Sequence, residues 1–401
     1  MKFLRMIIPV ALLIGSPLFS GAQSLVKDGE VINTITTAVP FLMIKADARS
    51  GGMGDVGVAT PADANGLYTN PAKMAMVDRD YGFGVTYTPW LRALVNDINL
   101  ANLNGYYKIK EMQTIALSLR YLSLGRITFT NEVGEEIKEA RPNEFAIDVH
   151  YARKLIKTLS VGVSIRFIYS NLAQGFSLTD VPVNAGLAGS GDISLYWSQD
   201  FRTGSSMKSG VSAGMVISNI GNKISYSNSS PLAKDFLPCN LALGVGYRLD
   251  IDKNNSVGIY YDLNKLLVPT PDTVNNNGNP YPDWREKTVL GGIGSSFDPN
   301  QAPGGIGEKF RELSHGIGLE YFYNKQFGFR MGYFYEDPTK GARQFLQLGL
   351  TVKYSVAGLH FAYTVPTSQT RTPMDNTLRA SLLFEFTKSV KKKEPAPSEA
   401  K

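Results

Sequence analysis

The chain contains a single cysteine, Cys239, among 401 residues, so no intrachain disulfide can hold its fold together. Its three histidines, His150, His315 and His360, are too widely spaced to resemble a zinc site, and we expect neither a metal nor a cofactor. No Lys/Arg-rich face interleaved with aromatic residues is present, which argues against nucleic acid as a partner. The fold must therefore be held by packing and polar contacts alone.

Long apolar runs are also scarce. The longest, Met6–Phe19, is short for a membrane-spanning helix, which needs about 20 apolar residues, and no later run is long enough. It follows the basic residues Lys2 and Arg5 and ends in small residues before Gln23. This pattern is typical of a secretory signal peptide, so we expect residues 1–22 to export the chain rather than anchor it.

In place of long apolar runs, the chain has many short segments in which apolar and polar residues alternate. From Tyr81 onward, apolar residues alternate with polar or small ones, and 39 glycines with 11% aromatic residues indicate short strands and tight turns. Because successive side chains of a strand point to opposite faces, this alternation gives each strand one apolar face and one more polar face. We count about fourteen such segments near the ten-residue length of a tilted membrane strand. Their expected centres are Val85, Leu103, Leu117, Ile147, Ile165, Leu195, Ala213, Val245, Ile259, Leu319, Met331, Leu350, Phe361 and Leu382.

The alternation alone also fits a soluble β-sandwich, but the charged and aromatic residues favour a membrane barrel. The charges that lie opposite the apolar face are Arg120, Arg166, Asp262, Glu320, Arg330, Lys353, Arg379 and Glu385. A lipid-facing arginine or lysine at mid-membrane would cost about 2–4 kcal/mol. The aromatic residues near strand ends on the apolar face are Tyr87, Tyr121, Tyr151, Tyr169, Trp197, Tyr247, Tyr335 and Phe386. Such girdles are typical of membrane interfaces.

Connector lengths give the orientation. Connections after even-numbered strands are short, whereas most of those after odd-numbered strands are long, as between residues 265 and 312. Short periplasmic turns alternating with long extracellular loops are typical of outer-membrane barrels. We therefore predict an all-β membrane protein, a 14-stranded antiparallel outer-membrane β-barrel over residues 81–386, with a periplasmic basic tail at 387–401.

Residues 23–80 lack the alternation and are rich in Gly, Ala and Asp. Because the lumen of a fourteen-stranded barrel is too wide for its own side chains to fill, we expect this segment to fold inward as a hatch. A disordered periplasmic leader is the alternative. Gly52 and Gly54 belong to a G-x-G-x-x-G pattern with no helix after it, which indicates a kink rather than a dinucleotide site. Asn70-Pro71, near the end of the hatch, favours a turn.

No catalytic residue is expected. Gly210–Gly214 matches G-x-S-x-G, but it lies inside a predicted strand, whereas a nucleophile elbow needs a strand-to-helix turn. Some barrel enzymes carry a Ser-His pair, so catalysis stays open on the sequence alone. In the first long loop, Trp90, Leu91 and Leu94 are candidate contact residues, with membrane anchoring as the alternative for Trp90.

Several stretches carry a family resemblance. They are Thr37–Leu42, Ala46–Asp55, Asn70–Ala72, Tyr87–Leu91, Pro142–Ala146, Asp262–Thr270 and Ala302–Gly305. The hatch stretches resemble the FadL-type barrel superfamily, which has fourteen strands and an N-terminal plug. The combination closely resembles the PorV (LptO) family, outer-membrane shuttle components of the type IX secretion system.

The resemblance implies a protein-handling role. PorV proteins bind the C-terminal signal domain of secreted proteins as these leave a translocon barrel of the SprA/Sov type. They then deliver the cargo to a surface attachment complex containing a PorU-like sortase. Outer-membrane lipids are the remaining partners that we expect. The loop 265–312 is the expected docking surface because its prolines limit its flexibility, and its candidate contact residues are Leu267, Pro269, Pro271, Tyr281 and Trp284.

Two alternatives stay open. A FadL-like transporter of hydrophobic small molecules would need an apolar pocket in the lumen near the hatch. An enzyme that modifies lipid A is suggested by the second name of the family.

Overall fold

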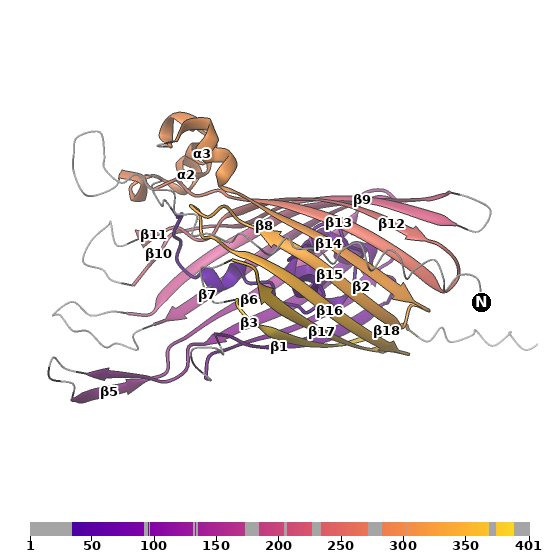
Figure 1. Ribbon diagram of the computed structural model, residues 1–401, viewed down its shortest axis with the longest axis horizontal. Coiled ribbons are helices and arrows are strands. Elements are labelled where there is room, and N and C mark those ends of the chain that lie inside the picture. The colour runs from indigo at the N-terminus through magenta and orange to yellow at the C-terminus, as the bar shows by residue number, and fades with distance from the viewer. Residues whose placement is uncertain are drawn as a thin grey trace, which may run out of the picture.

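In the computed structural model the chain forms one closed barrel around an N-terminal hatch (Figure 1). The structure describes residues 34–388 except 92–94, 96, 131–132, 134, 173–183, 204–206, 227–233, 272–282, 303 and 369–373. The expected signal peptide and nearly all of the basic tail lie outside the described residues.

Fourteen antiparallel strands make the wall. They are β1 (Tyr81–Pro89), β2 (Asn99–Lys110), β3 (Gln113–Ser123), β6 (Asn143–Lys154), β7 (Leu159–Asn171), β8 (Gly186–Arg202), β9 (Lys208–Gly221), β12 (Asn240–Asp250), β13 (Asn255–Leu266), β14 (Leu313–Tyr323), β15 (Phe327–Tyr335), β16 (Gln344–Tyr354), β17 (Ala357–Pro366) and β18 (Leu378–Phe386). Each strand pairs with its neighbours in this order, and β18 pairs with β1 to close the barrel. Every predicted strand centre falls inside a strand, and the predicted barrel is confirmed.

The two faces of the wall separate as the alternation predicts. In β1, Phe83, Val85 and Tyr87 are about half exposed on the outside, whereas Thr86 and Thr88 are fully buried towards the lumen. The predicted lumen charges Arg120, Arg166, Asp262, Glu320, Arg330 and Arg379 are all buried. A closed barrel is required here because every backbone group in lipid needs a partner inside the protein.

The two ends of the barrel differ. One end carries short turns such as 111–112 and 324–326, which places it in the periplasm. The other, extracellular end carries the long loops, with two hairpins and short helices (Figure 1). These are β4 (Ile127–Thr130) with β5 (Glu136–Ala140), β10 (Ile224–Ser225) with β11 (Lys234–Asp235), and η6 (Asp283–Arg285), α2 (Val289–Ser295), η7 (Pro299–Gln301) and α3 (Gly305–Arg311). Across the part of the chain that the structure describes, every helix is too short or too polar to cross a bilayer.

The hatch fills the lumen with four 3-10 helices and the turns between them. They are η1 (Pro40–Met43), η2 (Ser50–Gly52), η3 (Ala64–Tyr68) and η4 (Pro71–Met76). Small residues permit this packing: Ala48, Ala59 and Ala64 are fully buried. The hatch therefore lies inside the barrel, as the composition of this segment predicts.

Candidate functional site

At two glycines the backbone of the hatch lies directly against the backbone of the wall. Gly54 has a φ of 70°, a left-handed conformation that favours glycine, and a Cβ there would lie 2.5 Å from the carbonyl oxygen of Ile317. A Cβ on Gly52 would lie 2.8 Å from the Cα of Gly349 in β16. No helix opens on these glycines, so the motif serves close packing in the lumen and not a dinucleotide site.

The Asn70-Pro71 pair starts helix η4 instead of a simple turn. The Asn70 side-chain oxygen accepts a hydrogen bond from the Ala72 amide at 3.1 Å, and Pro71 occupies the first helical position. The Asn70 amide donates to the carbonyl oxygens of Val58 at 3.0 Å and Leu195 at 2.9 Å. One residue thus caps a helix, holds the hatch turn and attaches it to β8.

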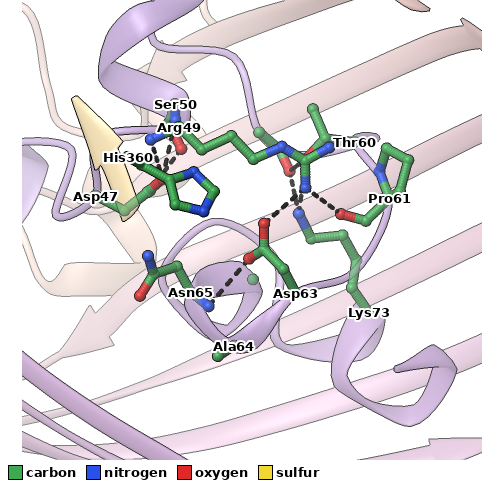
Figure 2. Close-up of polar contacts among 12 residues, drawn as sticks. Asp47, Arg49, Ser50, Thr60, Pro61, Asp63, Ala64, Asn65, Lys73 and His360 are labelled. Atoms are coloured by element: carbon green, nitrogen blue, oxygen red, sulfur yellow. Dashed lines mark hydrogen bonds and ion pairs between the residues drawn. The ribbon is translucent and has the colours of Figure 1, made fainter. Parts of the chain in front are cut away.

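A buried ion network joins the hatch to strands β14 and β15. Arg49 of the hatch lies 2.7 Å from Asp63 and 2.8 Å from Glu320. Arg330 contacts the same Glu320 carboxylate at 2.7 Å. Figure 2 shows the Arg49 guanidinium pointing towards Asp63 and the Pro61 carbonyl oxygen. All four charged side chains are at most 10% exposed, so each depends on its partners for charge compensation.

A second buried cation, Lys73, joins two segments of the hatch to each other. Lys73 Nζ donates to the carbonyl oxygen of Gly57 at 2.5 Å and to Thr60 Oγ1 at 3.0 Å (Figure 2). Lys73 is 1% exposed. Lys73 therefore joins helix η4 to the hatch segment that contains Gly57 and Thr60.

The serine and histidine residues do not form a hydrolase site. Ser212 lies inside β9 and donates to the carbonyl oxygen of Ala59 at 2.6 Å, so it is no nucleophile elbow. His150 Nε2 lies 3.0 Å from Ser118 Oγ, which donates to Asp148 at 2.8 Å, and the Nδ1 partner is Ser164 Oγ at 2.7 Å, whereas in a triad a carboxylate holds that nitrogen. Ser118 and His150 are 1% and 2% exposed. Among the described residues, no three His, Cys, Asp or Glu side chains are grouped so that they could hold a metal ion.

The lumen keeps little free space on the extracellular side of the hatch. A cavity of about 90 Å³ lies there, and its lining includes the charged residues Arg120, Arg166 and Arg343. Sites for small hydrophobic ligands usually measure about 300–1,000 Å³ and are mostly apolar. On the periplasmic side, a cavity of about 710 Å³ is lined by many charged residues, including Lys353 and Glu385. Neither space is a large apolar pocket.

The extracellular loops form an ordered surface that we call the loop platform, made of the described residues of 222–239 and 267–312. Its core contains Trp284, which is 5% exposed and stacks on Phe236 with ring centroids 6.3 Å apart. Val268 packs against both rings and is fully buried. Arg285 and Asp235 join the two loops with an ion pair of 3.4 Å. The platform is therefore a packed unit and not a loose loop.

A polar clasp closes the base of the loop platform where the chain enters β14. The Glu312 carboxylate accepts hydrogen bonds from Lys265 at 2.6 Å and from Thr270 at 2.5 Å, and Lys309 lies 3.4 Å away. Burial alone would raise the pKa of Glu312. The hydrogen bonds from Lys265 and Thr270 and the two lysine charges more than offset burial and lower this pKa below its ordinary value.

We expect the clasp to open only in acid. Because the pKa of Glu312 is lowered in the folded protein, its carboxylate stabilises the platform above the ordinary glutamate pKa, and this stability is lost as the pH falls through the lowered value. Each unit of lowering corresponds to a roughly tenfold change in the open population. Pepsin cleavage within 267–312 should therefore accelerate as the pH falls below about 4.3. The variant Glu312→Gln should be cleaved rapidly at every pH tested; a wild-type rate that follows only pepsin's own pH profile contradicts the assignment.

The structure places most of the predicted contact residues inside the loops and not on their surface. Trp90 is 7% exposed and packs with Phe334, Phe345 and Met374, so the expectation of an exposed rim tryptophan is wrong. Leu267, Pro269 and Trp284 are also buried, because the loop platform needs a core of its own. Leu91 and Pro271 are half-buried. Leu94 and Tyr281 lie outside the described residues.

The exposed apolar residues of the loop platform are others, which the sequence analysis missed. Leu290 is 77%, Phe297 51%, Ile306 65% and Phe310 66% exposed. The available signal was the spacing of four between Ile306 and Phe310, which places both on one face of a short helix. Nothing in that spacing says whether the face turns inward or outward.

Comparison with known proteins identifies a family. Residues 27–273, more than half of the chain, match the model of the family described as "Type IX secretion system protein PorV". No curated protein matches the chain.

Solved structures with a similar fold were also found. The toluene transporter TodX of P. putida aligns at 10% identity over 86% of this chain and 99% of its own, with a TM-score of 0.47. The toluene transporter TbuX of Ralstonia pickettii aligns at 13% identity over 86% and 100%, with a TM-score of 0.45. A FadL homologue of Pseudomonas aeruginosa aligns at 12% identity over 88% and 99%, with a TM-score of 0.41.

Proposed function

The chain belongs to the PorV family of type IX secretion system proteins, and from this premise we propose that it is a non-catalytic cargo shuttle of the outer membrane. In this role it binds the C-terminal signal domain of a secreted protein that leaves the translocon barrel. It then delivers this cargo to the sortase-containing attachment complex at the cell surface. The amino-terminal signal peptide exports the chain for this purpose.

The observation that carries the proposal is the blocked lumen beside an ordered loop platform. The hatch is attached to the wall by close glycine contacts and by the Arg49–Glu320–Arg330 network. The extracellular cavity of about 90 Å³ is too small and too charged for a hydrophobic ligand. A transporter needs a path through the lumen, whereas a protein shuttle needs only an outer surface.

The loop platform offers such a surface at a low cost in conformational entropy. The Trp284–Phe236 stack and the Glu312 clasp hold it in one arrangement before any partner arrives. Binding to a preordered surface costs less free energy than ordering a loop during binding. The predicted contact residues then act by shaping the platform, and the outer surface that they support meets the partner.

We expect trimming of the loop platform to abolish cargo capture while the barrel still folds. Replacing residues 286–301 by a short Gly-Ser linker removes α2 and leaves the Trp284 core and the Glu312 clasp in the chain. Removing the central contacts of an interface commonly costs 2 kcal/mol or more, about a thirtyfold loss of affinity. The measurement is binding of a purified C-terminal signal domain to the protein in detergent.

The matched control shortens another extracellular element, the hairpin β4–β5, which lies apart from the loop platform (Figure 1). Its binding should equal that of the wild type, and both variants should keep the heat-dependent gel mobility of a folded barrel. If the trimmed platform binds cargo normally, this docking surface is wrong.

Affinity purification from detergent-solubilised outer membranes, followed by mass spectrometry, tests the partners themselves. The shuttle role predicts recovery of a very large translocon barrel, a sortase-like protein or surface proteins with a shared C-terminal domain. Recovery of the barrel alone with a bound fatty acid or other hydrophobic molecule would favour a transporter instead.

A further inference from the structure

The short helix α3 has its polar and apolar faces reversed with respect to an ordinary surface helix. Glu308 and Lys309 are each only 8% exposed and turn towards the protein, where Glu308 pairs with Lys340 and Lys309 with Glu312. Ile306 and Phe310 point away from it, 65% and 66% exposed. A surface helix in water normally buries its apolar side. This arrangement indicates that something other than water covers the outer face.

The position of α3 indicates that lipid covers this outer face. Along β13, Ile259 and Tyr261 face outward into the lipid-facing band, and by the same alternation so does Lys265 near the end of the strand. The loop platform continues from this end and returns at Leu313 of β14. In Figure 1, α2 and α3 lie outside the outline of the barrel wall, at its extracellular end. The helices that carry the exposed apolar residues thus lie beside the end of the surface that the wall presents to lipid.

The outward-facing Lys265 is shielded as expected next to an apolar phase. Its ammonium group donates to Glu312 at 2.6 Å and lies 5.6 Å from the centre of the Phe297 ring. Lys265 is only 7% exposed. A lysine in open water needs neither a buried counter-ion nor an aromatic cover, whereas one at a membrane boundary gains from both.

We propose that α2 and α3 form an interfacial anchor that docks onto the outer leaflet of the membrane. Leu290, Phe297, Ile306 and Phe310 enter the boundary between headgroups and acyl chains beside β13 and β14. Apolar faces of interfacial helices lie about 5–10 Å into this boundary. The anchor holds the loop platform at a constant height above the membrane. It is independent of what the platform binds.

Fluorescence quenching by brominated lipids tests the anchor. Cysteines replace Ile306, Phe310 or, on α2, Leu290, and carry an environment-sensitive NBD label. The control site is Val133 at the tip of the β4–β5 loop, which is 79% exposed. The native Cys239 is 3% exposed, and burial raises the pKa of its thiol to about 12, so the wild type serves as the labelling blank. The full-length protein is reconstituted in phosphatidylcholine–phosphatidylglycerol vesicles with acyl chains brominated near the headgroup.

We expect brominated lipid to quench the label at the anchor positions by about half or more, because a group 5–10 Å deep lies beside the bromines. The label at Val133→Cys should keep its intensity. Equal and weak quenching at all positions would overturn the proposal. It would also be overturned if the anchor labels stay in water in pure lipid and become protected only after a purified translocon barrel is added, since the face would then be a protein interface. Neither outcome depends on cargo capture.

Discussion

Replacing Glu320 by glutamine is expected to destabilise the folded protein by about 3–5 kcal/mol, the usual cost of breaking a buried ion pair by removing one partner. Glu320 is the only carboxylate within ion-pair distance of both Arg49 and Arg330 in the described structure. Arg49 would keep Asp63, but Arg330, which is 0% exposed, would lose its counter-ion. Because Arg49 belongs to the hatch and the other two residues to the wall, the hatch should also loosen.

The measurement is unfolding in urea, followed by gel mobility, together with proteolysis of the hatch under native conditions. The control variant is Glu139→Gln in the hairpin, whose partner Arg126 lies 2.6 Å away, with both side chains about half exposed. Such surface pairs contribute about 0–1 kcal/mol, so this variant should unfold like the wild type. If Glu320→Gln behaves like the control, the network does not stabilise the hatch.

The second large effect is expected at Gly332 in β15, where even a methyl group has no space. A Cβ there would lie 2.0 Å from the carbonyl carbon of Met53 and 2.3 Å from the amide nitrogen of Gly54. Overpacking usually costs about 1–3 kcal/mol of folding stability. We expect the loss for Gly332→Ala at or above the upper end of this range, because the new methyl group would meet backbone atoms of the hatch, which cannot turn aside as a side chain can. The hatch must move away from the wall or the strand must bend.

Gly105 provides the matched control, since it lies in a barrel strand and faces lipid. A Cβ there would have its nearest contact at 3.6 Å, which is ordinary van der Waals distance. Heat-dependent gel mobility should show a lower unfolding temperature for Gly332→Ala and little change for Gly105→Ala. Equal temperatures for the two variants would mean that the hatch does not press on β15.

The barrel wall could be predicted from the sequence because its cause is local. Neighbouring side chains in a strand point to opposite faces, and a charge at the centre of the bilayer is costly. The alternation around Leu319 or Phe361 therefore indicates which side chains face lipid and which face the lumen. The position of Glu320 and Arg330 in the lumen followed from the same alternation. That Glu320 meets Arg49, 271 positions earlier, did not follow, because no local pattern encodes such a contact.

The loops show most clearly which contacts could not be predicted from the sequence. Trp90 was expected on an exposed rim and Trp284 on the docking surface of a proline-rich loop, yet both are buried in small cores. These cores form between loops that are distant in sequence, as when Trp284 stacks on Phe236. The reversed faces of α3 were likewise invisible, because a spacing of four residues defines a common face but not its direction.

The alternation of residues, the composition and the connector lengths were enough to predict the closed antiparallel barrel, its lumen and lipid faces, its orientation and the glycine-rich hatch, because each of these can be recognised within one stretch of the chain. The structure was needed to show which residues hold the hatch to the wall, which aromatic residues are buried in the loops, and which apolar side chains remain exposed outside the wall. These features depend on contacts between segments that are distant in sequence and come together only when the barrel closes. The energy of such a contact depends on both segments together, so neither segment alone reveals it.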